Sequence, residues 1–159
     1  MNEILALLEN DSKLTPKQIA AATGRDETEV QAAIAKYETE GTILKYTTLI
    51  NRDNLDEESV TALIEVKIAP QLGEGYDRIA QRIYQYDEVD SLYLMTGSYD
   101  LLVTMTARTM KDAAQFVYAH LAAIDGVTST ATHFIMKKYK EQNCVFVKEP
   151  EQEERLYFV

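Results

Sequence analysis

An internal repeat constrains the fold of this chain more than any other feature of its sequence. Residues 63–69 (LIEVKIA) align with residues 101–107 (LLVTMTA), an offset of 38 residues. The same offset relates further positions: Ile79 to Val117, Ile83 to Leu121, and residues 87–91 to residues 125–129. Apolar residues alternate at the ends of each unit and recur at spacings of three and four between them, which predicts strand, amphipathic helix and strand. Two such units in series predict a ferredoxin-like split βαβ fold within an α+β chain, with four antiparallel strands and two helices on one face of the sheet.

The helices of the repeat are expected at residues 76–86 and 111–123. Since both cover the same face, the other face of the sheet is left open. We expect apolar residues on this open face, such as Val66, Ile68, Val103 and Met105. An apolar sheet face in water requires a partner. The simplest partner is the same face of a second copy, which predicts a symmetric dimer.

Residues 1–50 contain the patterns of three short amphipathic helices. Asn2 is positioned to cap the first helix, and Thr15 and Gln18 predict a capping box at the start of the second. We expect Gly24 to end the second helix, and Gly41 the third, in a left-handed conformation. The residues expected to face inward are Ile19, Ala20 and Ala22 in the second helix and Val30, Ala33, Ile34 and Tyr37 in the third.

The end of this N-terminal third has a different composition. Residues 43–46 and 48–50 are rich in β-branched and aromatic residues and predict strand. Two short helices around a tight turn at Gly24, with a supporting first helix and a following β element, outline a winged helix-turn-helix. A three-helix bundle without a binding role has the same pattern, so on the residues alone both alternatives stay open.

The charge balance and the cysteine count exclude several classes of protein. The chain has 16 Lys and Arg against 26 Asp and Glu, a net charge of −10, and nucleic-acid binding through bulk charge usually requires a basic domain. No apolar run approaches the roughly 20 residues of a membrane span, and the N-terminus lacks the basic region of a secretory signal. The single cysteine, Cys144, cannot form an intramolecular disulfide, which fits the cytoplasm. Residues 149–154 predict a solvated acidic tail.

The sequence contains no motif for catalysis, for a metal or for a cofactor. With two histidines, His120 and His133, and one cysteine, it lacks the spacing of a zinc site. It has neither a dinucleotide-binding nor a P-loop glycine motif. No pair of carboxylates is singled out for acid–base chemistry. We therefore expect neither an enzyme nor a cofactor.

The segment that joins the two repeats, residues 95–100, combines Gly97 with Tyr99 and Asp100. Glycine permits a positive φ, and the Asp100 carboxylate is an acceptor for backbone amides or for an amino group. Two interpretations follow, a simple hairpin turn or part of a ligand pocket. The residues alone favour the turn.

Several motifs resemble those of the Lrp/AsnC family of transcriptional regulators, over nearly the whole chain. They are, in order, residues 14–20 (LTPKQIA), residues 37–43 (YETEGTI) with Tyr46 and Thr47, residues 97–100 (GSYD), residues 124–127 (IDGV) and residues 130–132 (TAT). Ser98 stands where the hallmark loop of the family has Asp. The resemblance implies a DNA-binding helix-turn-helix, a β hinge and a ferredoxin-like effector-binding domain. It also implies dimers that assemble further, often into octamers, with a small effector, commonly an amino acid, bound between dimers.

The resemblance assigns the effector loop to Gly97, Ser98, Tyr99 and Asp100. Positions where the family tunes its effector response are implied at Leu94, Met110, His133, Phe134 and Ile135. An amino-acid ligand requires an acceptor for its ammonium, which Asp100 offers, and N–H donors for its carboxylate, which a glycine-containing turn offers. With the resemblance, ligand binding becomes the favoured interpretation of this loop.

The predicted recognition helix departs from the family, whose members usually have several arginines there. Ala33 and Ala35 occupy the usual basic positions. The residues left for phosphate contacts are Lys17, Arg25, Lys36 and Lys45, and those left for base edges are Thr28 and Gln31. Because affinity grows with the number of phosphates neutralised, we expect a single head to bind double-stranded DNA weakly. An oligomer that presents several heads to one DNA compensates for this weakness.

We therefore divide the chain into a helix-turn-helix domain (1–50), a hinge (51–59), a ferredoxin-like ligand-binding and oligomerisation domain (60–142) and a C-terminal strand with an acidic tail (143–159). The resulting hypothesis is a cytoplasmic, sequence-specific transcriptional regulator that responds to a small effector, expected to be an amino acid. The first alternative is an effector-binding oligomer with weak or no direct DNA binding, since residues 1–50 hold eight acidic against five basic residues. The second alternative is an enzyme, because some relatives of this family resemble decarboxylases that act on tetrapyrroles.

Overall fold

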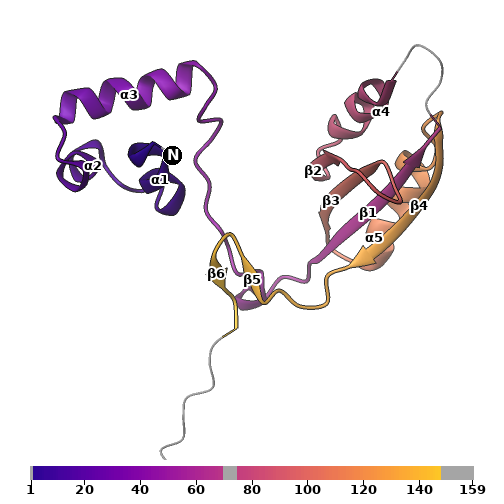
Figure 1. Cartoon of the computed structure of the whole chain (residues 1–159). Coiled ribbons are helices and arrows are strands. Elements are labelled where there is room, and N and C mark those ends of the chain that lie inside the picture. Colours follow the sequence, from indigo (N-terminus) through magenta and orange to yellow (C-terminus); the bar gives the residue numbers. More distant parts are fainter. Residues whose placement is uncertain (1, 70–74, 148–159) are drawn as a thin grey trace, which may run out of the picture. The chain divides into compact units, whose positions relative to one another are not determined.

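A computed structural model describes residues 2–69 and 75–147 of the 159-residue chain (Figure 1). The chain divides into two compact units, residues 1–50 and residues 51–159, which we describe separately. The acidic tail expected at residues 149–154 lies outside the described residues. Within the described part of the chain, no helix combines the length and the apolar character needed to cross a membrane.

The first unit consists of three helices, α1 (Glu3–Asn10), α2 (Pro16–Thr23) and α3 (Glu27–Thr39). Their ends confirm the capping predictions, because the Asn2 side chain accepts a hydrogen bond from the Ile4 N–H and Thr15 and Gln18 form the capping box. Gly24 ends α2 at a φ of 66°. The core of this unit is formed by Ile4, Leu8, Ile19, Ala20 and Val30. Two helices joined by a tight turn at Gly24 and supported by a third agree with the helix-turn-helix prediction.

Two expectations for the first unit are wrong. Ala22 is exposed, whereas Ile19 and Ala20 are buried. Residues 42–51 form no strand, so the predicted wing is absent from the described chain. A strand requires a second strand to pair with its N–H and C=O groups, and no described segment offers that pairing here. Leu44 in this extended segment is 88% exposed.

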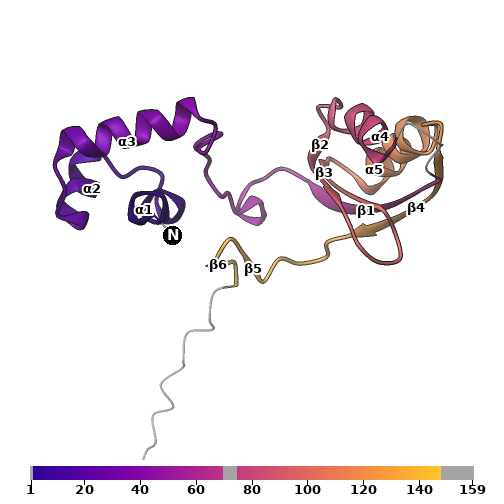
Figure 2. The same ribbon diagram turned by 45° about the horizontal axis from the view of Figure 1, so that its top comes forward.

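The second unit is the ferredoxin-like domain that the repeat predicts (Figure 2). A short 3₁₀ turn, η1 (Arg52–Asn54), comes first. The elements that follow are β1 (Val60–Ile68), α4 (Gly75–Tyr84), β2 (Val89–Leu94), β3 (Leu101–Ala107), α5 (Met110–Phe116) and β4 (Val127–Phe134). The strands pair antiparallel in the order β2-β3-β1-β4. Figure 2 shows α4 and α5 together on one face of this sheet.

The assignment of residues to the two faces of the sheet is opposite to the expectation. Val66, Ile68, Val103 and Met105 lie beneath the helices, where they are buried with residues such as Ile83. The prediction was wrong because it placed the more apolar set of alternating residues on the open face. The helices cover one face of the sheet with their apolar residues. A polar strand residue buried there would lose its hydrogen bonds to water, so the apolar set of alternating residues occupies that face.

The face away from the helices holds the alternate residues of each strand, most of them polar. By register they include Thr61, Leu63, Glu65, Lys67, Tyr93, Leu102, Thr104, Thr106, Ala131 and His133. His133 Nε2 lies 3.3 Å from Glu65 Oε1 on this face. The open face is therefore not the apolar surface from which we predicted a symmetric dimer.

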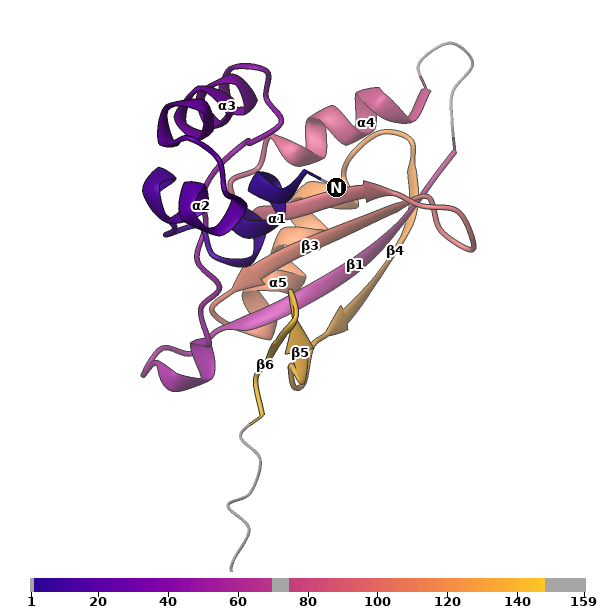
Figure 3. The ribbon, with the colours of Figure 1, turned by 60° about the vertical axis from the view of Figure 1, so that its left-hand side comes forward.

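Two further features depart from the expected elements. The second repeat helix is α-helical only to Phe116 and continues as a π-helical turn, η2 (Val117–Leu121). After β4, a hairpin forms between β5 (Lys140–Glu141) and β6 (Cys144–Val145). Figure 3 shows this hairpin following the end of β4. The expected boundary between residues 142 and 143 falls in its turn, where Gln142 and Asn143 have positive φ values of 45° and 64°.

Candidate functional site

The loop between β2 and β3 is a closed hairpin connection. The two strands end at the pair Leu94 and Leu101, and the Met95 N–H then donates to the Asp100 carbonyl at 2.8 Å. Gly97 has a φ of 139°, a conformation that side chains disfavour. Gly97 and Ser98 are exposed, whereas Tyr99 and Asp100 are half-buried. The loop is thus both a hairpin turn and an accessible surface.

Asp100 anchors this loop to the rest of the domain. Its Oδ2 accepts a hydrogen bond from the Ile68 N–H at 2.7 Å, and its Oδ1 accepts one from the Tyr76 hydroxyl at 3.4 Å. Its own N–H donates to the Val66 carbonyl at 3.0 Å. Asp100 therefore binds the end of β1 and the start of α4 at once. A carboxylate has about four acceptor positions, so these two bonds leave capacity for a ligand.

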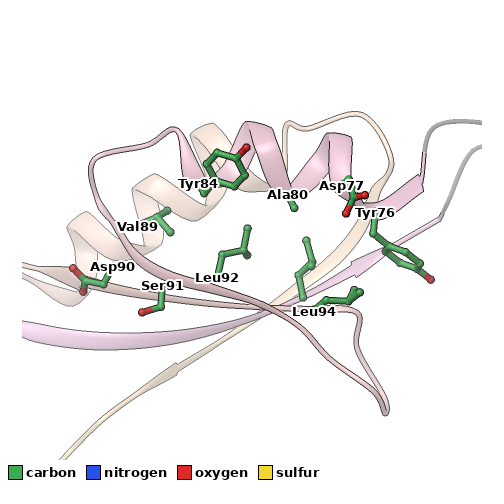
Figure 4. Close-up of a pocket in the computed structure, with 10 residues that line it drawn as sticks. Tyr76, Asp77, Ala80, Tyr84, Val89, Asp90, Ser91, Leu92 and Leu94 are labelled. Atoms are coloured by element: carbon green, nitrogen blue, oxygen red, sulfur yellow. The ribbon is translucent and has the colours of Figure 1, made fainter. Parts of the chain in front are cut away.

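A cleft of about 370 Å³ opens beside the loop, between α4 and β2 (Figure 4). We call it the α4–β2 cleft. Its apolar lining includes Ala80, Val89, Leu92, Leu94 and Leu101. Its polar lining consists of Tyr76, Asp77, Tyr84, Asp90 and Ser91. No lysine or arginine is among the described residues that line it, so the cleft is suited to an apolar or aromatic body with a donor or a positive charge.

The other residues implied for the effector site lie at the far end of the sheet. Phe134 pairs with Ala62 at the beginning of β1, whereas the loop contacts the end of β1. Ile135 follows there, with its N–H donating to the Thr61 carbonyl, and His133 is on the face away from the helices. Met110 begins α5 at the same end, just after β3 pairs with Val60. Of the residues implied for the effector site, only Leu94 lines the α4–β2 cleft, and residues 97–100 form the loop next to it.

The residues implied for DNA contact all lie on the surface of the first unit. Thr28 and Gln31 are exposed on α3, whose buried residue is Val30. Arg25 lies 3.9 Å from Glu3, and Lys36 lies 3.7 Å from Glu40, each in an exposed ion pair. Lys17 and Lys45 form no ion pair with a described residue. The exposed pairs are worth little, so all four cations remain available to phosphates.

Sequence reasoning missed the side-chain contacts of one tyrosine in each unit, Tyr76 and Tyr46. Tyr76 completes the anchoring of Asp100 from 24 residues away, and no local pattern links two positions separated by a helix and a strand. In the first unit, the Tyr46 hydroxyl donates to Glu38 Oε1 at 2.8 Å, which raises the pKa of Tyr46 above its usual value. This bond fastens the extended segment to α3. No three potential metal ligands gather anywhere among residues 2–69 and 75–147.

Comparison with known proteins identifies the class to which this architecture belongs. Residues 61–145 match the family model of the Lrp/AsnC ligand binding domain. The chain is also 44% identical over 145 residues to the HTH-type transcriptional regulator YugG of Bacillus subtilis, covering 91% of this chain and 87% of that protein. The chain belongs to the Lrp/AsnC family. This Lrp/AsnC protein is a transcriptional regulator with an N-terminal helix-turn-helix and a ligand-binding domain.

Solved structures of Lrp/AsnC regulators share the fold. Escherichia coli AsnC superposes with a TM-score of 0.69 at 17% identity, covering 87% of this chain and 91% of that one. A transcriptional regulator from Neisseria meningitidis, solved as a complex with L-methionine, superposes with a TM-score of 0.71 at 22% identity, covering 87% and 89%. At these identities the likeness concerns the fold, which extends over both units of the chain.

Proposed function

We propose that this Lrp/AsnC regulator senses a small amine-bearing metabolite, with a free amino acid as the expected class, at the α4–β2 cleft and the loop beside it. The observation that carries the proposal is the lining of the cleft, in which two carboxylates and two tyrosines surround an apolar floor. An ammonium group is held there by Asp77, Asp90 or the remaining acceptors of Asp100. The ligand's carboxylate takes N–H donors from the turn at Gly97 and Ser98. The L-methionine bound to the Neisseria meningitidis regulator supports this class of ligand.

A complete site in this proposal requires more than one copy of the chain. Leu94 and residues 97–100 are at one end of β1, and Met110 with residues 133–135 are at the other. They can line one site only if the second group comes from a neighbouring copy. The exposed apolar side chains of Leu44, Tyr46 and Ile50 also favour self-association. We therefore propose a dimer that assembles further, with an octamer as the expected end point.

The output of the proposed regulator is a change in DNA binding. Thr28 and Gln31 contact base edges, and Lys17, Arg25, Lys36 and Lys45 contact phosphates. Effector binding favours one arrangement of the assembled copies and so changes the spacing of their DNA-binding units. We place this action in the cytoplasm and assign no catalysed reaction to the protein. The exposed single thiol of Cys144 supports a reducing compartment.

The acidity of the first unit favours a second candidate, an effector-binding oligomer that does not bind DNA directly. Its eight acidic residues oppose five basic ones. Electrophoretic mobility shift on the protein's own upstream DNA, at low and moderate salt, separates the two candidates. A retarded band that responds to the effector supports the regulator, and no band at either salt supports the second candidate.

A thermal-shift screen against the standard amino acids tests the effector site, because a ligand that binds only the folded state raises the melting temperature. Leu94→Arg introduces a bulky cation at the rim of the cleft, where Leu94 is 63% exposed and its replacement leaves the core intact. Gln81→Arg adds the same charge on α4 at an exposed position outside the cleft. We expect the stabilising amino acid to act on the wild type and on Gln81→Arg but not on Leu94→Arg. Equal stabilisation of all three contradicts the proposal.

A further inference from the structure

A second cavity lies at the opposite end of the domain from the effector loop. It is an open hollow of about 480 Å³ between residues 52–60 and the end of β3, and its charged side chains are exposed. We call it the hinge-side cavity, because it lies directly after the point at which the chain leaves the first unit. Its charged lining consists of Arg52, Asp53, Glu57, Glu58 and Arg108. All of its lining residues belong to the second unit.

The charges around the hinge-side cavity do not neutralise one another. Neither Arg52 nor Arg108 forms an ion pair within 4.0 Å, or a side-chain hydrogen bond, with any residue that the structure describes. The carboxylates of Asp53, Glu57 and Glu58 are likewise without a partner in the described chain. A guanidinium presents five N–H donors in a planar fork that matches a carboxylate. Two such forks and three carboxylates around one cavity, none of them paired with a described residue, are complementary to a ligand that carries both signs of charge.

We propose that the hinge-side cavity is a second small-molecule site, which binds a zwitterion of the α-amino-acid type. Arg52 and Arg108 hold the ligand's carboxylate, and Glu57 and Glu58 accept hydrogen bonds from its ammonium. The site differs in chemistry from the α4–β2 cleft, whose described lining has carboxylates but no cation. A simple amine has no carboxylate to pair with the two arginines, and a simple carboxylic acid has no ammonium to pair with the two glutamates.

The position of this site means that a bound ligand would restrict the start of the second unit. Arg52 is in η1, whereas Arg108 immediately follows β3. A ligand held by both fastens residues 52–58, the beginning of the second unit, to the sheet. This restricts the segment through which the DNA-binding unit is attached. Such restriction is a regulatory effect that requires no change in the fold of either unit.

Hydrogen–deuterium exchange on the full-length protein tests the proposal with each standard amino acid as the probe. The corresponding amines and the corresponding carboxylic acids are measured in parallel. We expect at least one amino acid to slow exchange in peptides covering residues 52–60, which belong to this cavity alone, and its two analogues to have no effect there. Protection of residues 95–101 reports the α4–β2 cleft separately, so failure at one site is distinguishable from failure at the other.

Matched variants complete the test. Loss of a charge-assisted hydrogen bond lowers affinity by about ten- to a hundredfold, so Arg108→Gln shifts the concentration for half-maximal protection by that factor. Glu58→Gln weakens binding of the same amino acid, while Arg82→Gln, an exposed change on α4, leaves it unchanged. Absence of protection by every amino acid overturns the proposal. So does equal protection by an acid and its amino acid, which makes the cavity a plain anion site.

Discussion

Replacement of Asp100 by alanine separates anchoring of the loop from ligand binding. The Asp100 carboxylate is the acceptor for the Ile68 N–H at 2.7 Å, and Ile68 itself is 7% exposed. Alanine leaves that N–H without an acceptor, which costs about 2 kcal/mol of folding free energy. For a domain of this size we expect the melting temperature to fall by about 10 °C. Asparagine retains an acceptor oxygen at the same place, so Asp100→Asn is expected to lose only the charge-assisted part of the bond.

Differential scanning calorimetry of the full-length variants measures this effect, with Asp87→Ala as the control. Asp87 is exposed in the loop before β2, and no described residue hydrogen-bonds to its side chain. We expect the order of stability to be wild type and Asp87→Ala, then Asp100→Asn, then Asp100→Ala. If Asp100→Ala melts at the wild-type temperature, the anchoring described for this residue is refuted. Loss of effector response in this variant cannot be assigned to lost ligand contact alone, so Asp100→Asn is the better probe of binding.

Three further outcomes test other parts of the structure. Gly126→Ala places a Cβ 2.9 Å from Ile79 Cδ1 at a φ of 95°, and we expect it to lower the free energy of unfolding by about 1–3 kcal/mol in urea titrations. Gly24→Ala meets no atom within 4 Å but keeps a φ of 66°, so we expect it to lower the free energy of unfolding by about 1–2 kcal/mol. The pKa of Asp26 lies below its usual 3.8 because the Thr28 N–H donates to its carboxylate. The ionised Asp26 therefore contributes fully to the free energy of unfolding above pH 3.8, and this contribution is lost as the pH falls through the lowered folded-state pKa. Asp26→Asn keeps the helix cap, so we expect it to abolish this part of the acid dependence of stability measured by circular dichroism. With four cations in each head, fluorescence anisotropy should give a log–log salt slope no steeper than about −4 per head; a much steeper slope contradicts the DNA contacts assigned to these residues.

The local features of the fold were predictable because their causes lie within a few residues. The capping box of Thr15 and Gln18 and the left-handed glycine at position 24 follow from short-range chemistry. The repeat predicted the sheet and its two helices because each unit contains a complete strand–helix–strand pattern. The wing was predicted from the composition of residues 43–50, and it is absent because β pairing depends on a second segment that composition does not provide.

The candidate site was predictable only in part. Residues 97–100 were assigned from a motif, but the contacts of Asp100 with Ile68 and Tyr76 join three separate elements. The face assignment of Val66 and Met105 failed for a related reason. Alternation divides a strand into two sets of residues, and only the position of the helices decides which set is buried. The hinge-side cavity had no signal in the sequence, since Arg52 and Arg108 belong to no motif.

Strand β1 connects the two ends of the second unit at which we propose ligand sites. Its last residue, Ile68, is bonded to Asp100 at the effector loop, and its first, Val60, lines the hinge-side cavity. Nine residues of extended chain span about 30 Å. β3 and β4 pair with this strand on both sides, so its backbone is hydrogen-bonded along most of its length. If both proposed sites bind ligands, β1 is the element through which the occupancy of one site would affect the other.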